Sequence, residues 1–133
     1  MEEQHIKEIP LENNLRIHIY DASRRLAGDR WLVKLIARIP IAVDNVLSEA
    51  EAGLPTKAAV KELIGDELVF EQEKIRNFID EREKDEVFQA LLDHFLSHSL
   101  TYLSHPEFAK RYTLKTFKEK EKQKAWQSGP RPA

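Results

Sequence analysis

The sequence predicts an α+β fold, in which an antiparallel sheet of about three strands packs against one long amphipathic helix and shorter helices. Apolar and polar residues alternate over residues 15–43, a pattern typical of strands with one buried face. Apolar residues recur at helical spacing over residues 81–104. The chain has 133 residues, of which 41% are hydrophobic, so it is long enough and apolar enough to form one core.

The alternating segment, residues 15–43, predicts a β-hairpin. In its first strand Leu15, Ile17 and Ile19 point to one side. In its second strand a longer set shares one side, namely Trp31, Val33, Leu35, Ala37, Ile39, Ile41 and Val43. Because successive side chains of a strand point to opposite faces, the two sets are expected to share one buried surface.

The register of this hairpin follows from the expected burial. A two-residue turn would set the apolar side of one strand against the polar side of the other, because a one-residue slip reverses every side chain. We therefore expect a three-residue loop at residues 27–29, with Ile19 opposite Ala37. This register places Arg25 opposite Trp31, where a guanidinium can lie over the indole ring.

The segments on either side of the hairpin carry weaker signals. Residues 1–12 are predicted to be a flexible or weakly extended lead-in, because Pro10 disfavours helix at the residue before it. Residues 44–55 are expected to form a connection. Thr56 is expected to cap a short helix that ends at Gly65.

Residues 67–79 are expected to form the third strand. Their ends are rich in residues that favour strands, around the polar centre Glu71-Gln72-Glu73-Lys74. Helical spacing through this segment is the alternative. We favour the strand because a two-stranded hairpin alone is only marginally stable.

Residues 81–104 predict the clearest helix of the chain. Asp80 and Glu83 have the spacing of a capping box at its start. Its apolar stripe consists of Phe88, Leu91, Leu92, Phe95, Leu96 and Leu103. This stripe is expected to cover the apolar face of the hairpin. A second helical turn is expected to begin near Pro106, with Phe108 and Tyr112 packed onto the core.

The chain is expected to form one domain over residues 1–117, followed by a charged, partly disordered tail over residues 118–133. Charged residues make up 33% of the sequence and the net charge is −2. The sequence contains no cysteine, which excludes disulfides, thiol catalysis and thiolate metal sites. No apolar run approaches the roughly 20 residues of a membrane-spanning helix, and no secretory signal pattern is present, so a cytoplasmic protein is expected.

A basic set of residues on the hairpin is the candidate ligand or partner surface. It comprises Arg16, His18, Tyr20, Arg24, Arg25, Arg30, Lys34 and Arg38. In the expected register His18 faces Arg38. Because like charges across a strand pair are unfavourable, we expect nearby carboxylate partners, and Glu71 and Glu73 are the candidates.

Three histidines, His94, His98 and His105, fall near one stripe of the long helix. Two imidazoles one helical turn apart can share a metal ion. The residues between them lack the glutamate of the zinc-protease signature. We favour the interpretation that these histidines line the polar flank of the helix, and we expect no metal and no cofactor.

These observations favour a small non-catalytic interaction or regulatory module that acts through a protein partner or as a homodimer. A sheet with few strands leaves edges that must be covered, charged or paired with another copy. The alternative is a protein that binds a polyanion, either nucleic acid or a phosphate ligand. It would use the basic hairpin together with Lys110, Arg111, Lys115 and Lys118. No nucleophile motif or cofactor loop supports an enzyme.

Overall fold

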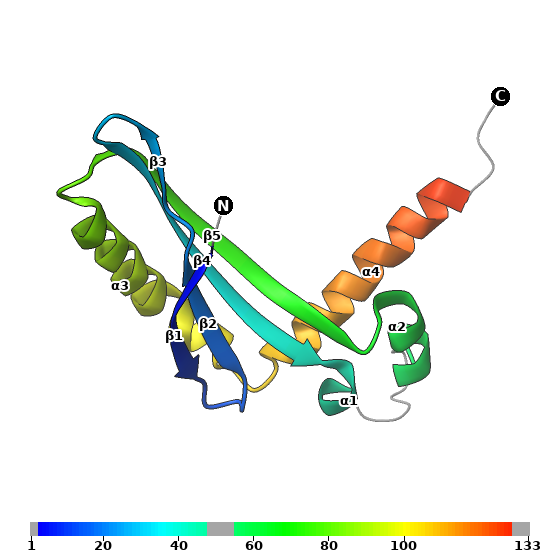
Figure 1. The fold of residues 1–133 in the computed structure, drawn as a ribbon. Helices are drawn as coiled ribbons and strands as arrows, with labels where there is room; N and C mark the ends of the chain where they lie inside the picture. The colour runs from blue at the N-terminus through cyan, green and yellow to red at the C-terminus, as the bar shows by residue number, and fades with distance from the viewer. Residues whose placement is uncertain (1–2, 48–54, 129–133) are drawn as a thin grey trace. The chain divides into compact units, whose positions relative to one another are not determined.

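The computed structural model describes residues 3–47 and 55–128, and these residues form an α+β fold with an antiparallel sheet. The elements in chain order are β1 (Gln4–Pro10), β2 (Arg16–Asp21), β3 (Arg24–Ala27), β4 (Arg30–Ala42), α1 (Val43–Val46), α2 (Lys57–Ile64), β5 (Glu67–Asp80), α3 (Lys84–Leu103) and α4 (Phe108–Ser128). Figure 1 shows their arrangement.

The chain divides into two compact units. The first, called here the sheet unit, comprises residues 1–40 and 69–106. The second, called here the helical unit, comprises residues 41–68 and 107–133. The long strands β4 and β5 each begin or end in the helical unit, whose described helices are α1, α2 and α4.

The described sheet has five strands, so the expectation of about three was too low. Four of them follow the order β1-β2-β4-β3, and β5 also pairs with β4. The strand missed by the sequence reasoning is β1, which lies in the segment expected to be a flexible lead-in. A bulge between His5 and Lys7 breaks its alternation, and Pro10 lies at its end, where a proline is tolerated.

The predicted register of the hairpin is confirmed, but the predicted loop is wrong. Ile19 pairs with Ala37, and Arg25 pairs with Trp31. Ala27 pairs with Arg30, so the turn has two residues rather than three. A bulge between Arg25 and Ala27 supplies the extra residue that returns the apolar faces to the same side.

A short break between β2 and β3 is closed by a side chain. The backbone N–H of Lys34 donates to the Ser23 hydroxyl oxygen at 3.0 Å, in place of a backbone carbonyl. The N–H of Ser23 in turn donates to Oδ1 of Asp21 at 2.9 Å. Because these hydrogen bonds satisfy the backbone groups at the break, β4 remains one continuous strand opposite it.

The third predicted strand is confirmed as β5, and the helical alternative for it is wrong. The short helix is confirmed as α2, in which Thr56 Oγ1 accepts the N–H of Ala59 at 3.1 Å. Gly65 follows the helix with a φ of 104°. Residues 48–54 of the expected connection lie outside the described residues.

The long helix α3 begins at Lys84, three residues later than predicted. The expected capping box does not form, because Asp80 Oδ1 accepts the N–H of Arg82 at 2.8 Å in a tight turn before the helix. The expectation of one long helix was also wrong. Helix α4 is a second one, with 21 residues. It extends to Ser128 through most of the predicted tail, and residues 129–133 lie outside the described residues.

The core of the sheet unit lies where the sequence predicted it. Ile17, Ile19, Val33 and Leu35 are fully buried, and each such side chain contributes about 1.5–3 kcal/mol on burial. Helix α3 adds three buried residues, Leu92, Phe95 and Leu103. It starts on this face of the sheet, because Lys84 Nζ lies over the Trp31 ring.

The helical unit has its own small core. The buried residues of its three helices include Val43, Val60, Phe108 and Phe117. The predicted packing of Phe108 is thus confirmed, and its ring stacks against Tyr112 with a centroid distance of 6.0 Å.

The two-residue turn predicts a specific cost for a side chain at Gly28, whose φ of 57° is left-handed. Gly28→Ala should lower the free energy of unfolding by about 1 kcal/mol, because Ala rarely adopts this conformation. Gly28→Asn should lower it by less, because Asn tolerates positive φ. Urea unfolding followed by circular dichroism measures both, and equal losses for the two variants would contradict the turn geometry.

Candidate functional site

The face of the sheet opposite the core, called here the polar face, carries five of the eight predicted site residues. These are Arg16, His18, Tyr20, Lys34 and Arg38, which alternate with buried residues along β2 and β4. The remaining three, Arg24, Arg25 and Arg30, lie at the tip of the β3–β4 hairpin. The structure therefore distributes the predicted set over two places.

Arg38 is the most strongly bound cation of the polar face. Its Nε lies 2.6 Å from Oε1 of Glu71, and its two terminal nitrogens each lie 2.7 Å from an oxygen of Glu3. Hydrogen bonds from both carboxylates raise the pKa of Arg38 further above its ordinary range. The bond with Arg38 lowers the pKa of Glu3. The guanidinium also lies 4.9 Å from the centre of the Tyr20 ring.

The other cations of the polar face also have acidic neighbours. Lys34 Nζ lies 3.3 Å from Glu73, so both predicted partners on β5 are confirmed. Arg16 lies 3.2 Å from Glu8 on β1. Because β1 and β5 supply carboxylates on the two sides of the basic strands, little unpaired positive charge remains on this face.

His18 lies within the same network. Its Nδ1 lies 3.2 Å from Nε2 of His5, which stands on β1. The ring of His5 also approaches Tyr20 edge-on, with a centroid distance of 5.2 Å. The polar face is thus a connected layer of side chains.

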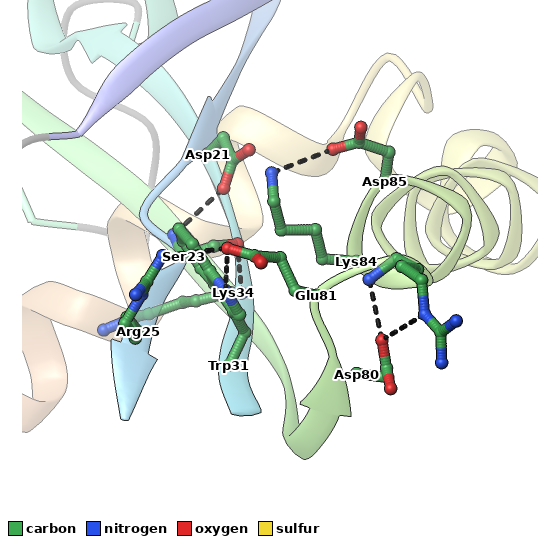
Figure 2. Close-up of polar contacts among 10 residues, drawn as sticks. Asp21, Ser23, Arg25, Trp31, Lys34, Asp80, Glu81, Lys84 and Asp85 are labelled. Atoms are coloured by element: carbon green, nitrogen blue, oxygen red, sulfur yellow. Dashed lines mark hydrogen bonds and ion pairs between the residues drawn. The ribbon is translucent and has the colours of Figure 1, made fainter. Parts of the chain in front are cut away.

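The hairpin tip is fastened to the turn between β5 and α3 by a second polar cluster, drawn in Figure 2. Glu81 Oε1 accepts from Arg25 at 2.9 Å and from the indole N–H of Trp31 at 3.3 Å. The backbone N–H of Glu81 donates to the carbonyl of Asp29 at 2.8 Å. Arg30 lies 3.7 Å from Asp80.

The indole of Trp31 lies between two cations of its own chain. The guanidinium carbon of Arg25 is 5.8 Å from the ring centre, which confirms the predicted contact. On α3, Lys84 Nζ is 4.8 Å from the ring centre. Both distances are within the range of favourable cation–π contacts.

A recess of about 630 Å³ opens beside Trp31, and we call it the Trp31 pocket. Its lining residues are Glu3, Gln4, Asp21, Ser23, Trp31, Lys84 and Asp85. All of them belong to the sheet unit. Figure 2 shows Asp21 and Asp85 on the two sides of the Lys84 ammonium group.

The Trp31 pocket combines an aromatic surface with the carboxylates of Asp21 and Asp85, while the third carboxylate of its lining, Glu3, is already bound by Arg38. Lys84 Nζ lies 3.3 Å from Oδ1 of Asp85, and Asp21 uses Oδ1 to accept the N–H of Ser23. Among the described residues, the second oxygen of each aspartate has no hydrogen-bond or ion-pair partner. Such a combination suits a positively charged group, because the indole face and the carboxylates attract the same sign of charge.

Most of this pocket was not predicted from the sequence. Trp31 was assigned to the buried face, Glu3 and Lys84 were not singled out, and Asp85 was given only a structural role in the first turn of the helix. Asp85 occupies the first turn of α3, where acidic residues are common for reasons of helix stability alone. The one signal was the pairing of Arg25 with Trp31, which marked the indole as a site for cations.

The histidine stripe does not form a cluster of three. His94 and His98 are stacked on α3 with a ring centroid distance of 4.0 Å, and His98 Nδ1 lies 2.9 Å from the carbonyl of His94. His105 follows the end of the helix. Within residues 3–47 and 55–128, no group of three or more acidic or histidine side chains is arranged to hold a metal ion.

No protein-family model, curated protein or solved structure matches this chain. Among the described helices, none is both long enough and apolar enough to cross a membrane.

The pairing of Arg38 with Glu3 predicts a specific pH dependence. A carboxylate whose pKa is lowered in the folded state stabilises the fold above its ordinary pKa, and this stabilisation is lost as the pH falls. The free energy of unfolding should therefore decrease between about pH 5 and pH 3. Arg38→Gln should be about 1 kcal/mol less stable at pH 7, with a smaller decrease over that range.

Arg24→Gln is the matched control, because Arg24 is exposed and forms no ion pair within the described residues. It should keep the native stability and the native pH dependence. Urea unfolding at several pH values measures all three proteins. An unchanged pH dependence in Arg38→Gln would contradict the assignment.

Proposed function

We propose that this protein is a non-catalytic interaction module, and that its Trp31 pocket holds a cationic side chain of a protein partner. The observation that carries this proposal is the position of Lys84, whose ammonium group lies between the Trp31 ring and Asp85. This lysine acts as an internal occupant, and its contacts indicate which chemistry the pocket accepts.

The internal occupant can be exchanged at low cost. The pair of Lys84 with Asp85 is exposed on the carboxylate side, where 94% of the Asp85 side chain is accessible. An exposed ion pair contributes only about 0–1 kcal/mol, and an exposed cation–π contact about 0.5–1 kcal/mol. A lysine or arginine from a partner can therefore replace Lys84, and the second oxygens of Asp21 and Asp85 offer it further hydrogen bonds.

The rigidity of the surroundings also supports binding at this place. Trp31 is held at its indole nitrogen by Glu81, and Ser23 is held by Asp21 and by the backbone of Lys34. Preorganised side chains lose little conformational freedom when a ligand binds. Aromatic residues in such recesses commonly dominate the energy of protein interfaces.

A peptide titration tests this function. In a Trp126→Phe background the only remaining tryptophan is Trp31, so its fluorescence reports on the pocket. We expect a tetralysine peptide to change the emission of Trp31. Removal of the internal occupant by Lys84→Gln should strengthen binding about fivefold, which corresponds to about 1 kcal/mol.

Lys7→Gln is the control, because it removes the same charge from an exposed position on β1. This control should leave the affinity within about twofold of the parent, as expected for a screened surface charge. Asp85→Asn should weaken binding. Equal affinities for Lys84→Gln and Lys7→Gln, or an unchanged emission throughout the titration, would exclude the pocket as the binding site.

Self-association is the second form that such a module can take. The support for it is strand β5, whose described strand neighbour is β4 and which carries the exposed apolar residues Val69, Ile75 and Phe78. Phe78 is 73% exposed and has a φ of 57°, a conformation that a bulky residue rarely adopts. A strand edge of this kind is a template for pairing with another chain.

Sedimentation analysis tests the homodimer. The native chain should sediment with twice its mass of 15.5 kDa, and Ile75→Lys should return it to the monomer because a charge on the exposed edge opposes pairing. Arg24→Lys keeps the native charge at another strand and should leave the dimer intact. A monomer at all concentrations would exclude self-association without bearing on the Trp31 pocket.

A further inference from the structure

Helix α4 carries a line of cations from its first turn to its middle, called here the cationic stripe. It consists of Arg111, Lys115, Lys118 and Lys122. At 100° per residue these four positions fall within a sector of about 60° on the helix surface. Over a rise of 1.5 Å per residue, the stripe is about 16 Å long.

These cations differ from those of the polar face. Within residues 3–47 and 55–128, their side chains form no ion pair or hydrogen bond, whereas Arg16, Lys34 and Arg38 all have carboxylate partners. Neighbouring like charges three or four residues apart each cost about 0.2–0.5 kcal/mol in a helix. A stripe of like charges that its own carboxylates do not neutralise is suited to an external anion.

The surface along the stripe is hollowed. A depression of about 430 Å³ is lined by Arg111, Leu114, Lys115, Lys118, Glu119 and Lys122. Beyond Phe117, which is 8% exposed, every residue of α4 up to Trp126 is exposed. Figure 1 shows α4 continuing as one helix past its contact with α2. The cations are thus presented at fixed intervals on an accessible helix.

Trp126 extends the stripe with an aromatic ring. Its side chain is 82% exposed, and by helical geometry it lies within about 40° of Lys122. Exposed aromatic rings stack on unpaired nucleic-acid bases, and each stacked base contributes about 1–3 kcal/mol. A row of cations followed by an exposed indole offers contacts both to the phosphates and to an unpaired base of a single strand.

We propose that the cationic stripe of α4, with Trp126, binds single-stranded nucleic acid without sequence preference. An anionic membrane fits the segment less well, because a helix that lies on a membrane needs an apolar face. Between residues 118 and 126 the only large apolar side chain is Trp126, and lysine and glutamate surround the helix. This site is separate in the sequence from the Trp31 pocket and does not depend on it.

The test uses a twelve-residue oligothymidine and the full-length chain with Trp31→Phe, so that the emission reports on Trp126. Binding should quench this emission. Four phosphate contacts predict a slope of about −2.8 in the logarithm of the affinity against that of the salt concentration. The affinity should therefore fall about twentyfold between 50 and 150 mM NaCl.

Two double variants separate the stripe from the charge of the helix as a whole. Lys118→Gln/Lys122→Gln removes two cations from the stripe, and should weaken binding at least about tenfold and halve the salt slope. Lys120→Gln/Lys124→Gln removes the same charge from roughly the opposite side of the same helix. It should keep the affinity within about threefold. Circular dichroism confirms that both variants retain their helix.

Each other outcome overturns the proposal. Equal weakening by the two double variants would show attraction to net charge alone. No quenching at 50 mM NaCl would exclude binding. Tighter binding to phosphatidylserine vesicles than to the oligonucleotide would assign the stripe to a membrane. Equal affinity for a twelve-base-pair duplex, with Trp126 emission unchanged, would exclude stacking on single strands.

Discussion

The strand β4 is the constraint on which the sheet unit depends, because the other described strands of its core pair with it or with β2. One side of β4 carries Val33, Leu35 and Ile39, which are fully buried. The other side carries Lys34 and Arg38, which require carboxylates from neighbouring strands. A single alternating sequence therefore determines both the hydrophobic core and the electrostatics of the opposite face.

That electrostatic requirement explains why the predicted basic surface is not a simple polyanion site. The cations were identified correctly from the sequence, and Glu71 and Glu73 were identified as partners. The sequence did not reveal the strand β1, which carries Glu8 and directly follows Glu3, and these two carboxylates lie on the other side. With the carboxylates from both sides of the basic strands included, Arg16, Lys34 and Arg38 on the polar face each have an acidic neighbour. Charge that is paired within the fold is poorly available to a ligand.

The sequence was informative where a regular period ran without interruption and uninformative where the chain departs from it. The register of the hairpin was predicted because a one-residue slip would have exposed Val33 and Leu35. The two-residue turn was not predicted. A two-residue turn with a bulge next to Ala27 gives the same register as a three-residue loop, and burial alone does not distinguish the two. The bulge in β1 interrupts the alternation by which this strand could have been predicted. The side chain of Asp80, expected to cap α3, instead accepts a hydrogen bond within the preceding turn.

The candidate sites contain charged groups that this internal pairing leaves without a partner of opposite charge. In the Trp31 pocket two aspartates, Asp21 and Asp85, lie near one lysine, and the proposed function assigns the place of that lysine to an external cation. On α4 the relation is reversed, since lysines outnumber glutamates and form one line. The sequence could show that α4 is basic. It could not show that carboxylates of β1 and β5 neutralise the cations of the hairpin. Because the hairpin cations are paired and those of the stripe are not, the stripe is the more available positive surface. Both proposals therefore rest on unmatched charge rather than on charge itself.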